Sequence, residues 1–217
     1  MHGPFMSTTN DADFWDRTSR RYAVAAIADP AGYERTLDRT RALLEPHARV
    51  LELGCGTGTT ALKLAGGVQS YLATDISTEM IAIAKEKHAA DPRPALSFRV
   101  ATAEMLTPEV EQFDAVLGFN YLHLVRDLPG TLRRIHALLR AEGLFITKTP
   151  CVGDMNPLIR LVLLPAMRAI GKAPHANVFK EAELSQLISA AGFDILVNER
   201  HATKGNEICP YIVARRR

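Results

Sequence analysis

The sequence lacks the features that mark several large classes of protein. Its 217 residues carry 26 lysines and arginines against 24 aspartates and glutamates, a formal net charge of only +2. So small a charge excludes the broad basic surface that drives nucleic-acid binding, and we expect no nucleic-acid partner. Internal repeats and low-complexity tracts are also missing. Because 47% of the residues are hydrophobic, the chain can bury one sizeable core, which predicts a single domain over residues 1–217.

Cysteine is scarce and long apolar runs are missing. Cys55, Cys151 and Cys209 lie far apart, and their odd number cannot close a disulfide framework. No apolar stretch approaches the roughly 20 residues that span a bilayer, and the start, MHGPFMSTTN, lacks the apolar segment of a secretory signal. These absences predict a soluble protein in the reducing cytoplasm, with attachment to a membrane surface left open.

From about residue 48 onward, short strand-like runs alternate with helical patterns, which is typical of a parallel sheet with helices on its faces. Strands are predicted at 49–53, 70–74, 96–100, 113–118 and 143–148, then after Gly192 and at the end of the chain. Only the loop HATKGN separates the last two, so they can pair antiparallel. We therefore predict an α/β, Rossmann-like doubly wound fold whose seven-stranded sheet is mostly parallel with one antiparallel strand.

Two segments fall outside this alternation. Residues 1–45 look helical from Asp13 onward and are expected to cap the fold, and residues 150–178 are expected to form a lid. The predicted core that binds a cofactor covers 48–149, and 179–217 supply a last helix and strands. In an open doubly wound sheet the ligand lies at the carboxyl ends of the strands, so added segments near that edge shape its pocket.

The stretch VLELGCGTGTT ends the first strand and places Gly54, Gly56 and Gly58 in the turn that follows. These glycines permit a tight turn that brings peptide N–H groups and a helix N-terminus against a ligand. Asp75 ends the second strand, where a carboxylate can accept hydrogen bonds from both hydroxyls of a ribose. Alone, the turn could be a plain connection and Asp75 could cap a helix beside Ser77. Together they favour a ribose-containing ligand.

Glu52 discriminates between such ligands. A dinucleotide fingerprint requires glycine or alanine at a position where this chain has Thr59. A pyrophosphate beside Glu52 would face like-charge repulsion, whereas a ligand with an ammonium and a sulfonium group would be attracted. S-adenosylmethionine is such a ligand and contains no phosphate. An NAD-type oxidoreductase is the disfavoured alternative.

At this point the chain resembles the class I S-adenosylmethionine-dependent methyltransferases. The similar segments are VLELGCGTG, ATDIS, FDAVLGFNYLHLV and LRRIHALLRAEGLFITKTP, within roughly residues 48–215. The resemblance implies that Glu52 and the glycines surround the methionine end, that Asp75 binds the ribose, and that Ile76 lies against the adenine. Where the family usually has Gly-Asp-Ala after the third strand, this chain has Thr102 at the aspartate position, followed by Ala103, and the threonine hydroxyl can still accept one hydrogen bond.

The N-terminal DFWDRTSRRYA is similar to small bacterial members related to quinone-biosynthesis methyltransferases, in which an aromatic of the first helix helps close the cofactor site. Tyr22 is the matching residue here. The full cofactor-binding set implied by the resemblance is Tyr22, Glu52, Gly54, Cys55, Gly56, Gly58, Asp75, Ile76, Thr102, Ala103 and Asn120.

Asn120, Tyr121 and His123 follow the fourth strand, at the edge where cofactor and acceptor would meet. Asn120 is expected to line the site. His123 either acts as a general base, for which an imidazole suits neutral pH, or supports the start of a helix. Asp114 begins the same strand at the opposite end, so its expected role is structural. No set of side chains has metal-ligand spacing, and we expect no metal.

Residues 155–172 leave three interpretations open. Arg160, Arg168 and Lys172 can share one side of a helix among apolar neighbours, and Pro165 would interrupt a helix through the whole span. The pattern fits a lid over an apolar pocket, plain packing or a dimer contact, or a membrane-surface contact. The oligomeric state stays undetermined by the sequence.

The predicted function is transfer of the sulfonium methyl from S-adenosylmethionine to a small, apolar or aromatic acceptor, with release of S-adenosylhomocysteine. Because the cofactor is a strong electrophile, the protein's main contribution is to hold acceptor and methyl in line. Quinone-like or other aromatic acceptors are favoured over phospholipid head groups, and residue types do not separate O-, N- and C-methylation. A non-catalytic cofactor-binding protein is the alternative from another class.

Overall fold

The structure is a computed structural model that describes residues 5–108, 112–169, 173–203 and 208–217. Its strands are β1 (Arg49–Leu53), β2 (Ser70–Asp75), β3 (Leu96–Val100), β4 (Phe113–Phe119), β5 (Leu139–Lys148), β6 (Phe193–Glu199) and β7 (Tyr211–Arg216). Its α-helices are α1 (Phe5–Ala23), α2 (Pro30–Arg41), α3 (Thr59–Leu64), α4 (Thr78–Ala90), α5 (Leu128–Leu138), α6 (Leu164–Ala169) and α7 (Glu181–Ala190). Short helical turns are η1 (Ala65–Gly67), η2 (Ala103–Met105), η3 (Val152–Asp154) and the π-helical η4 (Ile159–Leu163).

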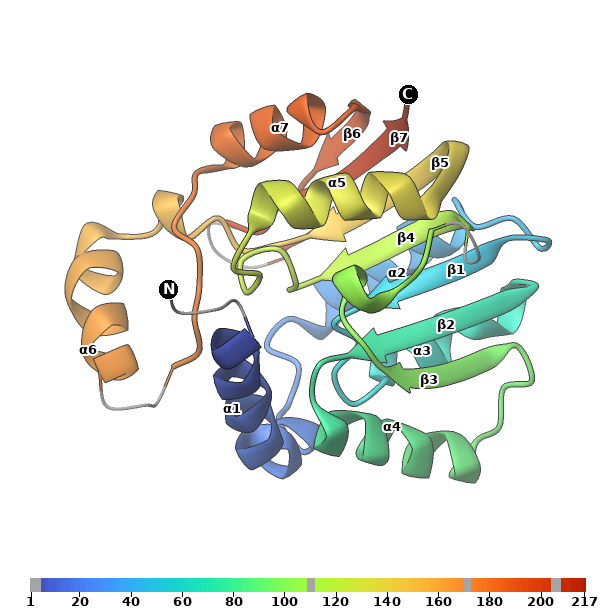
Figure 1. Ribbon diagram of the computed structural model, residues 1–217, viewed down its shortest axis with the longest axis horizontal. Coiled ribbons are helices and arrows are strands. Elements are labelled where there is room, and N and C mark those ends of the chain that lie inside the picture. The colour runs from blue at the N-terminus through green and yellow to red at the C-terminus, as the bar shows by residue number, and fades with distance from the viewer. Residues whose placement is uncertain (1–4, 109–111, 170–172, 204–207) are drawn as a thin grey trace.

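Across the described residues, the strands form one seven-stranded sheet in the order β3-β2-β1-β4-β5-β7-β6. The pairs from β3 to β5 are parallel, and β7 runs antiparallel to both β5 and β6. This confirms the predicted mostly parallel sheet with one reversed strand. The strand order reverses between β1 and β4, and their carboxyl ends meet at the edge where α/β sheets of this kind bind ligands. Figure 1 shows α1 and α6 beyond that edge.

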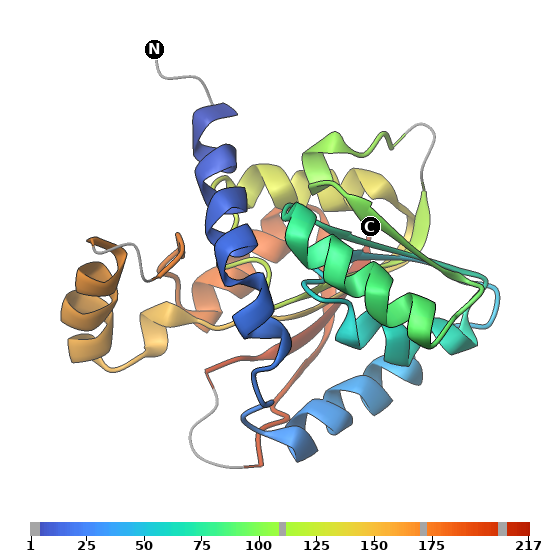
Figure 2. The same ribbon diagram turned by 90° about the horizontal axis from the view of Figure 1, so that it is seen from below.

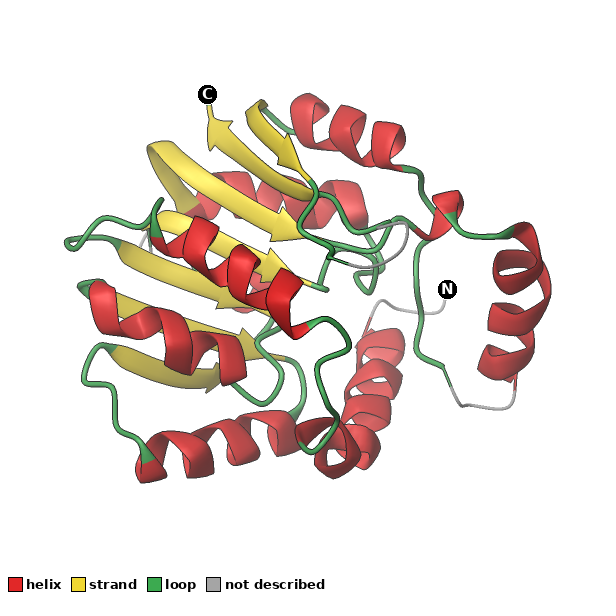
Figure 3. Cartoon of the chain, turned by 180° about the vertical axis from the view of Figure 1, so that it is seen from behind, coloured by secondary structure: helices red, strands yellow, loops and turns green. Residues whose placement is uncertain are grey.

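Helices cover both faces of the sheet, as a doubly wound fold requires. In Figure 1, α5 and α7 lie on the face toward the viewer, and Figure 3 shows α2, α3 and α4 on the other side. Two apolar clusters fill the layers between them. One holds Ile135 of α5 and Ile188 of α7, and the other holds Leu37 of α2 and Leu64 of α3.

Two elements begin earlier than the sequence predicts. Helix α1 starts at Phe5 rather than near Asp13. Strand β5 starts at Leu139, directly after α5, rather than at residue 143. Leu139 is fully buried, so its pairing with β4 begins at once, and the β4–β5 register then shifts while Glu142 takes a positive φ of 62°. The irregular residues 139–142 are the ones that the sequence predicts as a loop.

The segment between β5 and α7 departs from the sheet. In Figures 1 and 2, the part containing η4 and α6 lies on the same side of the molecule as α1, away from the strands. Pro165 lies in the first turn of α6, where a missing N–H costs no helical bond, and the preceding turn is π-helical. The helical assignment continues through Pro165 and changes from π to α directly before it, so the helix is not interrupted at this residue. The predicted basic side cannot be placed, because Lys172 and the side chains of Arg160 and Arg168 lie outside the described residues.

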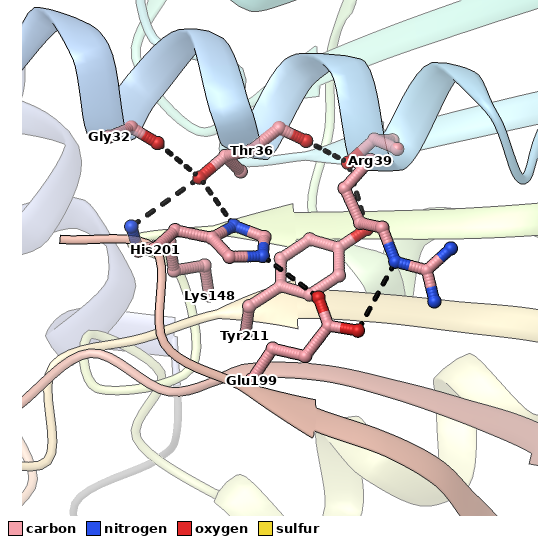
Figure 4. A network of polar contacts seen from close by, with 8 residues as sticks. Gly32, Thr36, Arg39, Lys148, Glu199, His201 and Tyr211 are labelled. Atoms are coloured by element: carbon pink, nitrogen blue, oxygen red, sulfur yellow. Dashed lines mark hydrogen bonds and ion pairs between the residues drawn. The ribbon is translucent and has the colours of Figure 1, made fainter. Parts of the chain in front are cut away.

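A buried polar network fixes α2 to the far strands of the sheet (Figure 4). Thr36 Oγ1 lies 3.0 Å from Nδ1 of the buried His201, and His201 Nε2 lies 3.0 Å from Glu199 Oε2. Arg39 Nε donates to the other carboxylate oxygen of Glu199 at 3.3 Å. Because both ends of the network are anchored, the first turn of α2 holds Tyr33 near the glycine turn, where its hydroxyl lies 3.0 Å from Thr60 Oγ1.

Within the described residues, no helix is both long enough and apolar enough to cross a membrane.

Candidate functional site

The glycine turn joins β1 to α3 with three left-handed residues, Gly54, Gly56 and Gly58, whose φ values are 68°, 53° and 73°. A residue with a side chain is strained in this conformation, so the turn requires glycine. Two of these glycines are also covered by aromatic rings. A Cβ on Gly54 would lie 2.7 Å from Tyr121 Cδ2, and one on Gly56 would lie 3.5 Å from Tyr22 Cε1. The turn therefore lies beneath two tyrosines from α1 and the β4–α5 loop.

Gly58 faces the interior of the fold instead. A Cβ there would lie 2.8 Å from the Phe98 ring and 2.9 Å from Ala84 Cβ, between β3 and α4. Lys87 of α4 holds the same loop from outside, because its Nζ donates to Thr57 Oγ1 at 2.9 Å. What the structure shows for Gly58 is close packing of helix against strand.

Asp75, at the end of β2, links the second strand to the glycine turn. Its Oδ2 accepts from the backbone N–H of Gly56 and its Oδ1 from that of Ser77, both at 2.9 Å. Burial raises the pKa of Asp75, and these N–H donors act in the opposite direction. Ser77 is the residue that caps α4, since its Oγ accepts from Met80 N–H at 3.0 Å. Asp75 is thus not the cap, and its carboxylate has acceptor capacity left for another donor.

Glu52 lies two residues before the turn with its carboxyl group buried. The residue is 2% exposed, and its Oε2 accepts a hydrogen bond from the Tyr71 hydroxyl at 2.8 Å. Burial raises the pKa of Glu52 to about 8, with the carboxyl of Asp75 adding to the effect against the Tyr71 hydrogen bond. In the part of the chain that the structure describes, no lysine or arginine pairs with Glu52.

Three tyrosines from three elements interact with this carboxyl group, one by a hydrogen bond and two electrostatically. Tyr71 of β2 bonds it directly, and the pKa of this phenol is raised well above its ordinary value by burial and then by Glu52. Burial raises the pKa of Tyr22 and of Tyr33 as well, and the Glu52 carboxyl adds to the effect in each. Aromatic rings around a buried acid form a chemical environment that suits an organic cation.

Helix α1 is held across this region by two acidic residues. Asp16 Oδ1 accepts from Ser77 Oγ at 2.5 Å and from Glu79 N–H at 3.1 Å, at the start of α4. Asp11 binds both Nε and Nη2 of Arg126 at 2.8 Å, in the loop between β4 and α5. Because α1 carries Tyr22, these contacts place that ring over the glycine turn.

The ends of β2 and β3 lie side by side, since Ala101 N–H donates to the Asp75 carbonyl at 3.0 Å. Ala103 is fully buried there, while Ile76 and Thr102 are half-buried. Tyr121 reaches the same place from the other side. Burial raises its pKa, and the carboxyl groups of Glu104 and Asp75 contribute.

The loop after β4 carries the two predicted residues nearest the acceptor side. Asn120 is exposed, has a positive φ of 52°, and donates its N–H to the Lys148 carbonyl at 2.8 Å. His123 Nδ1 is buried and has no hydrogen-bond partner within the described residues. Burial lowers the pKa of His123 to about 4, so the imidazole is neutral at neutral pH. The carbonyl of His123 accepts from Asn177 N–H at 2.6 Å, which ties the segment after α6 to this loop.

Apolar side chains are exposed on the segment beyond the edge. Leu158 and Leu161 are 67% and 65% exposed, and Val162 and Leu163 are more than half exposed. Several large apolar side chains exposed together mark a surface that contacts something else.

Two other possible sites carry no ligand chemistry. A hollow of about 540 Å³ lies between α7 and β6, where Glu181 accepts from Asn198 and pairs with Arg200. The charges of Glu181 and Arg200 are thus paired with each other. No cluster of histidine, cysteine or acidic residues among those described could hold a metal ion.

Asp114, at the opposite end of β4, accepts from Arg49 N–H and pairs with Arg140, which agrees with its predicted structural role.

The structure gathers at one edge Tyr22, Glu52, Gly54, Cys55, Gly56, Asp75, Ile76, Thr102 and Ala103 from the predicted cofactor set. It also brings in residues that sequence reasoning missed, namely Asp16, Tyr33 and Tyr71. The side chain of Tyr71 shares a face of the sheet with Glu52 because Val50 pairs with Tyr71 and Glu52 with Ala73. That register carries no signal in the sequence. Tyr121 is expected at this edge from its place after the fourth strand, and in the structure its ring lies against Gly54.

Comparisons with known proteins agree with this geometry. Residues 19–197 match a family model described as a methyltransferase domain. The chain is 28% identical over 204 residues to the zebrafish (Danio rerio) mitochondrial arginine-hydroxylase NDUFAF5, covering 88% of this chain and 62% of that protein. It is 32% identical over 148 residues to a ubiquinone biosynthesis O-methyltransferase of Rhodopseudomonas palustris (strain BisA53), covering 64% and 57%. The chain thus spans less than two thirds of the length of these relatives.

Among solved structures, magnesium protoporphyrin IX methyltransferase (ChlM) from Synechocystis PCC 6803, with bound S-adenosylhomocysteine, superposes with a TM-score of 0.73 at 18% identity. The superposition covers 97% of this chain and all of that one, so the fold is shared. The match of the family model over most of the sequence, together with the shared fold, shows that this chain belongs to the class I S-adenosylmethionine-dependent methyltransferases.

Proposed function

We propose that this protein binds S-adenosylmethionine over the glycine turn and transfers its methyl group to a small, apolar or aromatic acceptor, releasing S-adenosylhomocysteine. The observation that carries the proposal is the buried Glu52 carboxyl, which has a phenol partner and no cation among the described residues. A buried acid of this kind is costly unless a ligand supplies the opposite charge.

The residues present fit the cofactor group by group. Glu52 and its tyrosines suit the ammonium, and Asp75 has acceptor capacity left for ribose hydroxyls. The left-handed glycines let the backbone approach the ligand closely. Ile76 and Ala103 supply apolar surface for the adenine at the ends of β2 and β3.

When bound, the cofactor supplies a methyl group that is already strongly electrophilic. The chain's own task is then to hold the acceptor in line with that methyl and to keep water out. Tyr22 on α1 and Tyr121 after β4 lie against the turn. Where the acceptor must lose a proton, His123 is the proposed base, because its buried Nδ1 has no hydrogen-bond partner among the described residues. Its low pKa makes it a weak base, so it suits an acceptor that is itself acidic.

The proposal of an apolar acceptor is supported by the exposed side chains at Leu158, Leu161 and Val162. In a lid, these side chains would cover an apolar molecule held near Asn120 and His123. The similarity to ubiquinone biosynthesis O-methyltransferases supports a quinone-like or other aromatic compound. A membrane-surface contact through 155–172 is the competing role for the same side chains.

The first experiment is calorimetry of S-adenosylhomocysteine binding to the pure protein at pH 7.5. We expect a Kd in the micromolar range or tighter, and no binding would contradict the proposal. The second is incubation with S-adenosylmethionine labelled in its methyl group and fractionated cell metabolites, in which one fraction should take the label.

The similarity to an arginine-hydroxylase favours a second candidate, a protein that binds the cofactor without transferring its methyl group. Cofactor binding with no label transferred to any fraction would support this candidate over the first.

A further inference from the structure

We propose that Tyr71 is a positioning residue for Glu52, and that the site releases a proton from Glu52 when the ammonium group of the cofactor binds. The inference rests on the proposed function, since it requires an ammonium-bearing ligand at the glycine turn. It predicts that ligand binding is coupled to the release of one proton, and it gives Tyr71 a role in that coupling.

The Tyr71 hydroxyl has one hydrogen-bond partner among the described residues. Tyr71 is fully buried, and its hydroxyl donates to Glu52 Oε2 at 2.8 Å, with both side chains on the face of the sheet covered by α2 and α3. Because the pKa of this phenol is raised well above its ordinary value, the hydroxyl keeps its proton near neutral pH. Tyr71 therefore acts as the donor and orients the carboxyl group.

The groups that face Glu52 come from each element packed around it. They are Tyr71 and Asp75 from β2, Cys55 from the glycine turn, Tyr22 from α1 and Tyr33 from α2. All of them are neutral or acidic, so none favours the ionised carboxylate by its charge. In the free protein the Glu52 carboxyl keeps its proton at neutral pH, in agreement with its pKa of about 8.

An ammonium group beside Glu52 reverses this balance. The O–H bond of the carboxyl breaks, its proton leaves to solvent, and the carboxylate pairs with an ammonium that keeps its own protons. The phenol of Tyr71 also keeps its proton and continues to donate to the carboxylate. Because a hydrogen bond to an ionised acceptor is stronger than one to a neutral acceptor, Tyr71 favours the ionised, ligand-bound state.

Calorimetry of S-adenosylhomocysteine binding tests the inference when each titration is run in two buffers with different heats of ionisation, from pH 6 to pH 8. The wild type should release close to one proton per ligand at pH 6.5, and fewer as the pH approaches 8. Its affinity should fall about tenfold for each pH unit below 8. In Glu52→Gln, an amide that cannot titrate, the proton release attributable to Glu52 should vanish and the affinity should vary little with pH.

Tyr71→Phe removes only the hydroxyl. We expect its affinity at pH 7.5 to fall about tenfold, with more protons released at pH 8 than by the wild type, because the carboxyl becomes harder to ionise. In the Glu52→Gln background the same change should cost little, so the two effects should be coupled in a double-mutant cycle. The matched control is Tyr211→Phe, which loses an equally buried hydroxyl 3.0 Å from Thr40 Oγ1 and should leave the proton count unchanged.

A measurement on the wild type keeps the inference testable if Tyr71→Phe does not fold. Infrared difference spectra should show a protonated carboxyl band that disappears on addition of S-adenosylhomocysteine and is missing in Glu52→Gln. Binding without proton release overturns the inference while leaving the proposed function intact. A Tyr71→Phe variant that folds and matches the wild type in proton count and pH dependence overturns the role of Tyr71. Failure of the wild type to bind the ligand at any pH contradicts the proposed function itself.

Discussion

At the carboxyl edge of the sheet, the glycine turn and the segment from η3 to α6 differ in the kind of side chain that lacks a partner. The turn is built on β1 and β2 and buries the carboxyl groups of Glu52 and Asp75, with no cation paired to Glu52 among the described residues. The segment lies away from the strands and exposes Leu158 and Leu161 to solvent. The turn thus lacks a positive charge beside Glu52 among the described residues, and the segment has apolar side chains that are exposed to solvent.

The difference follows from how much each defect costs. A buried acid without a cation costs several kcal/mol, so it persists only in a rigid frame that holds it in place. An exposed leucine forgoes about 1.5–3 kcal/mol of burial, which a loosely attached segment can bear. The comparison predicts that the turn determines cofactor affinity and that the segment determines acceptor binding. Variants of the turn and of the segment should therefore have different effects.

The stability of the ligand-free protein should fall as the pH rises from 5 to 7.5. The pKa of Glu52 is about 8 in the native state and about 4.3 in an unfolded chain. Between these values the native state holds a proton that the unfolded chain has released, so each pH unit lowers the free energy of unfolding by about 1.4 kcal/mol. Urea unfolding of Glu52→Gln should show a slope against pH without this contribution. Equal slopes in the two proteins would contradict the prediction.

Asp75→Ala should weaken S-adenosylhomocysteine binding at least about 100-fold, or about 2.7 kcal/mol. The change removes the acceptor for the ribose and leaves the N–H groups of Gly56 and Ser77 without their carboxylate. Calorimetry measures the loss, and Asp75→Asn serves as a second variant that retains one acceptor oxygen. Asp114→Ala, at the far end of β4, is the control and should bind normally. Wild-type affinity in both Asp75 variants would remove this residue from the site.

Gly58→Ala should lower the free energy of unfolding by about 1–3 kcal/mol. The alanine would have to keep the positive φ of 73°, and its Cβ would lie less than 3 Å from Phe98 and Ala84. Gly66→Ala is a matched control, because nothing lies within 4 Å of its Cβ position. Urea unfolding should separate the two variants. Equal stability would show that the turn tolerates a side chain at Gly58.

Replacing Leu161 and Val162 together by serine should raise the KM for the acceptor about tenfold, as expected when two apolar contacts are lost. The affinity for S-adenosylhomocysteine and the melting temperature should stay unchanged, because both side chains are exposed. Leu196→Ser, an exposed leucine of β6, is the control. Kinetics with the active metabolite fraction measure the effect. A loss of cofactor affinity instead would place this segment in the first region.

Arg126→Gln should raise the dissociation rate of S-adenosylhomocysteine by about 2- to 5-fold, the range expected for a partly exposed ion pair. The change breaks the two contacts with Asp11 that hold α1 across the edge. High salt should reduce the difference from the wild type. Arg93→Gln removes a comparable two-point contact with Asp91 elsewhere and should have no effect. Stopped-flow displacement measures the rates, and equal effects of the two variants would exclude a role for α1 in retaining the ligand.

Part of the site was predictable because its signals are local. The positive φ values of Gly54, Gly56 and Gly58 are permitted by the residue type, and a carboxylate at the end of a second strand is a feature of a linear pattern. Asp16 and Tyr71 were not predictable in this way. Asp16 lies 61 residues from the Ser77 hydroxyl that it binds, and the contact depends on where α1 crosses α4.

The role of Gly58 shows the same limit. The resemblance to the family implies that it lies at the methionine end, whereas the structure shows its missing Cβ facing Phe98 and Ala84. The sequence predicts that glycine is required at position 58. It does not predict that Phe98 and Ala84 leave no room for a side chain there.

The sequence by itself determined the alternation of strands and helices, the glycine turn and the two acids beside it, because each depends on residues close together in the chain. Only the tertiary structure decided that Tyr22, Tyr33 and Tyr71 interact with Glu52 without a cation among the described residues. Strand register and helix packing join segments far apart in sequence, and the energy of a buried charge depends on every group that those contacts bring near it.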